Sequence, residues 1–320
     1  MKPRYVKSGL RPYLSCTIAL WLLGSLGVWA IPPSTGADPG SDWALPTPTA
    51  ISPGTSEHAH LIRPIGDTAD ARPDRFYPYG STGQGRYPPH HGVEFVYPVG
   101  TPVLAVADAV VVVAGSDNYT LVGPHLDYYG TLVILRLQPA IDQSQPIYVL
   151  YGHLSQVLVH VGQQVRRGEI VGLIGSTGIA IGPHLHLEIR VGENALSHTR
   201  NPELWLDSLP GHGTIVGRVE KDGQAVPGTL VTFHPVQRPD RYWREAWTYT
   251  GLPGKHIASD KVWRESFVMG DVPAGEYIIH TRIDGQLKTR RVRVTEGKTV
   301  YVSFIALSAE RLFVSGPSLY

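Results

Sequence analysis

Two histidines at alternate positions of one apolar stretch are the first residues whose spacing could do chemistry. In residues 182–190, leucine and isoleucine alternate with polar residues, which predicts a strand with one apolar face packed inward. His184, His186 and Glu188 should then project together from the other face. Two imidazoles on one face suit a metal ligand beside a second, catalytic histidine. Because any half-exposed strand can carry this pattern, its weight depends on partners elsewhere in the chain.

Two upstream segments supply such partners. His90 and Glu94 are four residues apart and share a face if their segment is extended, and His153 follows an apolar run. The three segments together offer two histidines and a carboxylate to one ion, with two histidines left over. This composition matches a catalytic zinc site, which has three protein ligands and one open position. His91 competes with His90 for the ligand role, but the residue four positions after His91 is Phe95, which cannot bind a metal.

The surrounding motifs resemble a known family. Their order and spacing are carried by residues 100–103, 161–165, 175–178 and 182–186. The stretch from about residue 77 to residue 191 is similar to the LytM/lysostaphin-type zinc metallopeptidase domain, family M23, whose members cleave peptides of bacterial cell walls. The resemblance is specific because several motifs occur in the family's order along most of that stretch.

The resemblance implies a role for each residue of the set. His90, Glu94 and His186 would bind one zinc ion. His153 and His184 would flank the attacking water, one as general base and the other holding the oxyanion or protonating the leaving amine, in either order. The family normally has aspartate where this chain has Glu94. The extra methylene moves the carboxylate by roughly an ångström unless the backbone compensates, and catalytic rates are sensitive at that scale.

Glu188 has a different expected role in the same stretch. We interpret it as a hydrogen-bond or salt-bridge partner of Arg190 or of loop backbone. The prediction for Glu188 is therefore structural support and not metal binding.

Composition favours a β-rich protein. The 320 residues include 35 glycines and 27 prolines, and only 17% are charged, which is typical of turn-rich β-architecture and not of helical bundles. The formal net charge of +1 gives no indication of nucleic-acid binding. The one cysteine, Cys16, lies in the N-terminal apolar segment, so we expect neither a disulfide nor a cysteine-based zinc site in the mature chain.

The N-terminal residues have the layout of an export signal. Basic residues without acidic ones precede an almost wholly apolar run that ends near residue 30. Residues 1–30 are therefore predicted to be a signal peptide or an uncleaved signal anchor, the one expected membrane contact, and the protein to be secreted or held in the cell envelope. Residues 31–75 are predicted to be a linker or a pro-segment. His58 and His60 in this segment are expected to be exposed to solvent. In the alternative, one of them occupies the open metal position in a latent form of the enzyme.

The rest of the chain is predicted to be all-β. An antiparallel β-sheet peptidase domain with a polar metal groove should cover residues 76–208, without helices of more than two turns. Its strands, besides the one that carries His186, are expected at residues 101–107, 109–114, 130–137, 147–153 and 169–175. Loops at residues 116–129 and 138–145 are placed where they could wall the groove.

A second β region is predicted over residues 212–308. Its alternating strands are expected at residues 213–219, 229–233, 277–282, 289–294 and 299–306. Residues 272–277 resemble the late segment of carboxypeptidase-regulatory-like domains, which implies an immunoglobulin- or prealbumin-like β-sandwich with an accessory role. Its histidines are scattered and are read as ordinary surface or core residues: His212, His234, His256 and His280. Residues 309–320 are an unassigned tail.

Two other functions fit parts of this sequence. A non-enzymatic envelope protein could use such a domain to bind peptidoglycan or to regulate an amidase, but members of that kind typically lack metal ligands. A lipoyl-like carrier barrel is suggested by residues 161–168, yet that fold needs a modifiable lysine in a turn, and none occurs between Lys7 and Lys221. We therefore expect an exported zinc metalloendopeptidase that acts on peptide cross-links of peptidoglycan; its oligomeric state stays open.

Overall fold

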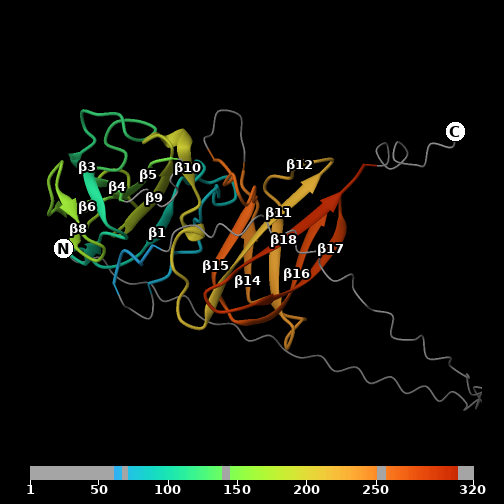
Figure 1. Ribbon diagram of the computed structural model, residues 1–320. Coiled ribbons are helices and arrows are strands. Elements are labelled where there is room, and N and C mark those ends of the chain that lie inside the picture. Colours follow the sequence, from blue (N-terminus) through green and yellow to red (C-terminus); the bar gives the residue numbers. More distant parts are fainter. Residues whose placement is uncertain (1–60, 67–70, 139–144, 251–256, 309–320) are drawn as a thin grey trace, which may run out of the picture. The chain divides into compact units, whose positions relative to one another are not determined.

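The computed structural model describes residues 61–66, 71–138, 145–250 and 257–308. The predicted export signal, most of the predicted linker with His58 and His60, the tail and His256 lie outside the described residues. Within them the regular secondary structure consists almost entirely of β-strands (Figure 1), which confirms the all-β prediction. The described helices are two short 3-10 turns, η1 (Leu196–His198) and η2 (Pro202–Leu204). None of the described helices has the length and apolar character needed to cross a membrane.

The first region contains a seven-stranded sheet in which all neighbours are antiparallel. Its strands in spatial order are β1 (Val93–Phe95), β9 (Leu185–Val191), β5 (Ile147–Gly152), β4 (Thr131–Leu137), β3 (Ala109–Ser116) and β7 (Gln164–Val165), with β10 (Thr199–Arg200) beside β9. A smaller antiparallel sheet contains β2 (Pro102–Leu104), β8 (Ile170–Ile174) and β6 (Leu154–Val157). The antiparallel class predicted for this region is confirmed.

The central strands of the main sheet are buried on both faces. Val133 and Leu135 of β4 pack in the main hydrophobic core of this region. Leu132 and Ile134 pack on the opposite face of the sheet, against Tyr129. β9 is buried along its whole length. Tyr129, which lies just before β4, covers this second face. The polar side chains of β9 are therefore buried and not on an open surface.

Part of the segment predicted as a linker packs against the main hydrophobic core of the first region. Leu61, Ile65 and Ala71 are buried there, and Arg75 forms an ion pair with Glu203 at 2.5 Å. The described residues of this segment therefore belong to the packed structure.

The second region contains two four-stranded sheets. One is formed by β12 (Gln224–Ala225), β11 (His212–Lys221), β15 (Phe267–Pro273) and β18 (Thr299–Ala306); the other by β14 (Arg244–Trp247), β13 (Leu230–Pro235), β16 (Gly275–Ile283) and β17 (Gln286–Val294). β18 runs parallel to β11, while the other described pairs of this region are antiparallel. One buried cluster takes Phe267 from the first sheet and Phe233 from the second, so both sheets share a core. The immunoglobulin- or prealbumin-like likeness of this region stays a prediction.

A buried carboxyl group in the second region should make stability depend on pH. Glu265 is fully buried and accepts hydrogen bonds from the Tyr249 hydroxyl at 3.1 Å and the Asp260 N–H at 2.9 Å. Burial raises the pKa of Glu265 from 4.5 to about 7. The native state therefore binds a proton between these values that the unfolded state does not, so stability should be highest below about pH 4.5 and fall as pH rises through 7.

We expect Glu265→Gln to remove this fall, because the amide cannot ionise. Between pH 5 and pH 8, the free energy of unfolding should fall more in the wild type than in the variant, by on the order of 3 kcal/mol. Denaturant titrations at both pH values measure the difference. Parallel pH profiles for the two proteins would show that Glu265 keeps an ordinary pKa.

Candidate metal centre

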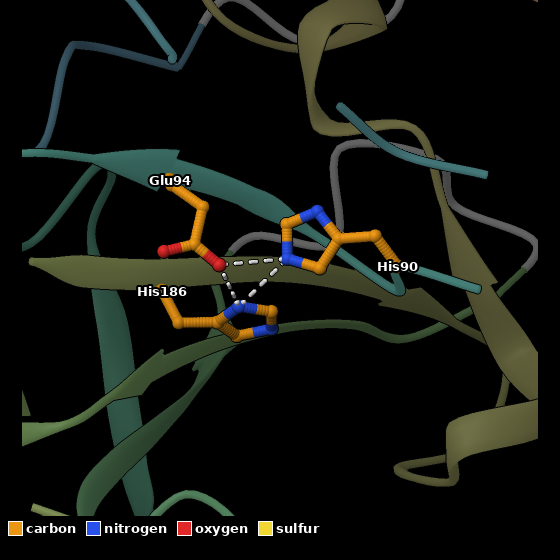
Figure 2. Close-up of side chains that lie close together, drawn as sticks. All are labelled: His90, Glu94 and His186. Atoms are coloured by element: carbon orange, nitrogen blue, oxygen red, sulfur yellow. Dashed lines mark hydrogen bonds and ion pairs between the residues drawn. The ribbon is translucent and has the colours of Figure 1, made fainter. Parts of the chain in front are cut away.

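Three potential ligands converge where β1 meets β9. Glu94 lies directly opposite His186 in the antiparallel pairing of these strands, and His90 lies just before β1. Figure 2 shows the side chains pointing toward one another, and the ligand atoms all lie within 4.8 Å of each other. Gly92 permits the close approach, since a Cβ there would lie 2.8 Å from His186 Nε2 and 2.4 Å from a backbone oxygen. The strand register thus joins residues far apart in sequence.

The spacing of the donor atoms fits a metal ion. His90 Nε2 lies 2.9 Å from Glu94 Oε1 and 3.1 Å from His186 Nδ1, and Glu94 Oε1 lies 3.3 Å from His186 Nδ1. Ligand atoms bound to a tetrahedral zinc ion at about 2.0–2.1 Å lie about 3.3 Å apart. Two imidazoles and one carboxylate are also a donor set that zinc prefers. Small shifts of these side chains would accommodate the ion.

The electrostatics of the cluster are dominated by burial and by Glu94. Burial raises the pKa of Glu94, but hydrogen bonds with His184, His186 and His90 outweigh it and hold the pKa well below its usual value. Burial lowers the pKa of His90, which favours the neutral form that binds metals. Burial also acts to lower the pKa of His186, but Glu188 and Glu94 outweigh it and raise this pKa to about 9. A metal ion therefore has to displace a proton from His186.

His153 lies beside the cluster in a constrained position. It follows β5 with φ +62°, its N–H donates to the Tyr129 carbonyl at 2.9 Å, and its Nδ1 lies 2.8 Å from the Thr177 carbonyl. A carbonyl oxygen can only accept, so Nδ1 carries the proton and Nε2 is left as the acceptor. Burial, and then the charges of His186 and His184, lower the pKa of His153 to about 3. This imidazole is thus neutral near pH 7.

His184 connects the cluster to His153. Its ring lies 4.7 Å from the His153 ring, its Nδ1 lies 3.0 Å from the Gly182 carbonyl, and its Nε2 forms an ion pair with Glu94 Oε2. Glu94 therefore contacts His90 and His186 through one oxygen and His184 through the other. All five residues predicted from the sequence to form the site lie together.

Part of the chain is similar to known peptidases. Residues 88–198 match the model of Peptidase family M23. The chain is 39% identical over 106 residues to peptidoglycan DD-endopeptidase ShyA of Vibrio cholerae (33% of this chain, 21% of the relative) and 34% identical over 124 residues to ShyB of the same organism (39% and 25%). It is 34% identical over 143 residues to lysostaphin of Staphylococcus simulans (45% and 25%). The matched part thus spans only about a fifth to a quarter of these relatives.

The family match and the relatives support an M23 peptidase domain in the first region. His90, Glu94, His153, His184 and His186 all lie inside the matched segment. The second β region lies outside it. What the individual residues of the M23-type site do stays a prediction.

Two neighbouring residues, His91 and Glu188, have contacts outside the set of three potential ligands. His91 turns to Thr199, with its Nδ1 3.4 Å from the hydroxyl, and burial lowers its pKa to about 4. Glu188 forms the expected ion pair with Arg190 at 2.8 Å, so its predicted structural pairing is confirmed. Burial raises the pKa of Glu188, but Arg190, His186 and Tyr129 outweigh it and hold the pKa well below its usual value.

Sequence reasoning missed Tyr129. Its hydroxyl donates to Glu188 Oε1 and its carbonyl accepts from His153, while the Asp117 carboxylate accepts its N–H at 2.9 Å. No spacing rule links Tyr129 to Glu188, because the loop that carries it is brought to β9 by strand pairing. The one available signal was the position of that loop, which was expected to wall the site.

Proposed function

We propose that this protein is an exported zinc metalloendopeptidase that hydrolyses peptide cross-links of bacterial peptidoglycan. The observation that carries the proposal is the convergence of His90, Glu94 and His186, with two further histidines beside them, inside the segment that matches family M23. Peptidoglycan as substrate is supported by the names of relatives, which include two peptidoglycan DD-endopeptidases. Export is supported by the layout of residues 1–30.

In this proposal each residue of the site has a defined task. His90, Glu94 and His186 would hold the zinc ion, which when bound supplies the Lewis acidity that activates water and polarises the scissile carbonyl. His153 is suited to accept a proton at Nε2, because its Nδ1 proton is fixed on the Thr177 carbonyl. His184 is suited to hold the developing oxyanion or to protonate the leaving amine, since its ring lies beside that of His153.

The second β region would serve an accessory role in this proposal. Among its described residues, His234 and His280 lie adjacent on neighbouring strands, with their rings 4.7 Å apart. The ring nitrogens of His234 already have partners in the Pro239 carbonyl at 2.8 Å and the Thr232 hydroxyl at 2.9 Å. We therefore assign the catalytic metal to the first region.

Protein purified without chelator should contain about one zinc ion per chain. Removing it with a chelator should abolish hydrolysis of peptidoglycan peptides, and added zinc should restore it, because the proposed reaction depends on metal-activated water. Elemental analysis and product release measure both. His234→Ala should leave zinc content unchanged and serves as a control for adventitious binding to a histidine outside the proposed site. Metal-free protein, or hydrolysis that resists chelation, would contradict the proposal; zinc binding without hydrolysis would favour the non-enzymatic envelope role.

A further inference from the structure

A row of buried polar residues extends from the cluster of potential ligands along one face of β9. Alternate positions of this strand carry His186, Glu188 and Arg190, which are 3%, 0% and 0% exposed. A buried ion pair often contributes no more stability than well-packed apolar residues would, because both charges must leave water. Its presence directly behind a potential metal ligand therefore points to a task other than packing.

Glu188 can select which nitrogen of His186 faces the metal. Its Oε1 lies 3.1 Å from His186 Nε2, and an ionised carboxylate only accepts hydrogen bonds. Nε2 must then carry the proton. The lone pair is left on Nδ1, which is the atom that lies among Glu94 Oε1 and His90 Nε2. Metal-binding histidines commonly depend on such a hydrogen bond for their tautomer, ring orientation and basicity.

Two further residues hold Glu188 in place. Arg190 donates to Oε2 from Nε at 2.8 Å and forms an ion pair with the same oxygen through Nη2, also at 2.8 Å, while the Tyr129 hydroxyl donates to Oε1. Arg190 is itself fixed by the Asn194 side chain at 3.1 Å and the Val122 carbonyl at 3.2 Å. The carboxylate thus has donors on both oxygens and cannot turn away from His186.

We propose that Glu188, held by Tyr129 and Arg190, is a positioning unit that fixes the Nδ1-coordinating tautomer of His186 and thereby sets the zinc affinity of the site. The inference rests on the proposed function for the identity of the metal. Tyr129 extends the unit to His153, whose N–H donates to the Tyr129 carbonyl at 2.9 Å. One residue of the β3–β4 loop thus supports both the metal ligand and the neighbouring histidine.

The test measures zinc affinity of the full chain, with zinc alone as the probe and a chromophoric chelator as competitor. Glu188→Gln should weaken zinc binding roughly 10–100-fold, the usual effect of losing such a partner. Tyr129→Phe removes one donor to Glu188 and should weaken binding less, by several-fold. Glu193→Gln changes an exposed carboxylate two residues beyond the end of β9 and should leave the affinity unchanged.

A double variant separates positioning from structural support. Glu188→Gln alone leaves Arg190 charged and buried, which can unfold the protein. Glu188→Gln with Arg190→Gln removes both charges and should recover thermal stability without recovering zinc affinity. In nitrogen–proton spectra, the His186 Nε2 proton of the zinc-loaded wild type should be observable and should exchange faster in Tyr129→Phe.

The outcomes distinguish this inference from the proposed function. Wild-type affinity in Glu188→Gln, or full recovery of affinity in the stable double variant, would overturn the inference while leaving the zinc peptidase proposal intact. A wild-type protein that binds no zinc would overturn both.

Discussion

Replacing His153 by asparagine should lower turnover of a soluble peptidoglycan peptide by roughly 10²–10⁴-fold while zinc stays bound, since this is the usual contribution of a positioned proton acceptor. Asparagine is preferred to alanine because His153 has φ +62°, a left-handed conformation that asparagine tolerates better than most residues. The neutral imidazole, with its pKa lowered by burial to about 3, is the group that the substitution removes. Steady-state kinetics and elemental analysis of the same sample measure both quantities.

His184→Ala should have an effect of similar size on turnover, because the ring beside His153 is lost while His90, Glu94 and His186 remain. His160→Ala is the matched control: this histidine is exposed, and only its backbone has a described hydrogen bond, to Gln163. Loss of zinc from either site variant would mean that ligand and proton-transfer roles are exchanged. Full activity in both would favour a domain that binds peptidoglycan without cleaving it.

The residues of the site could be predicted because their signals are local. Alternation along residues 182–190 places His184, His186 and Glu188 on one face, and the structure keeps them there. The joining of His90 and Glu94 to this strand was predicted only through the family resemblance. These residues meet because β1 pairs with β9 in a register that the sequence of β1 alone does not specify.

The features that could not be predicted depend on contacts distant in sequence. The loop at residues 116–129 was expected to wall a polar groove, but the packing of Tyr129 over the polar face of β9 was not predicted, because nothing near β9 specifies that contact. β15 was missed because Gly270 and Asp271 interrupt its apolar run; Asp271 has φ +52° at a register shift opposite β11. The parallel pairing of β18 with β11 likewise joins opposite ends of the second region.

Glu94→Asp should weaken zinc binding and lower turnover by roughly 100-fold, because a misplacement of about 1 Å at a reacting centre has that effect. The direction of the Glu94 side chain is fixed by its neighbours on β1, Val93 and Phe95, which are both fully buried. With the backbone held, a shorter side chain pulls its carboxylate away from His90 and His186. It also withdraws the second oxygen, which pairs with His184. Chelator competition and kinetics measure the two losses.

Glu94→Gln separates length from charge in the same position. Glutamine reaches as far as glutamate but lacks the negative charge that helps to hold a divalent ion, so zinc binding should fall further than in Glu94→Asp. Higher activity in Glu94→Asp than in wild type would mean that the native carboxylate is strained and that the backbone has not adapted to the longer side chain. Unchanged zinc affinity in Glu94→Gln would remove Glu94 from the ligand set. That result would favour the non-enzymatic, regulatory function over the peptidase.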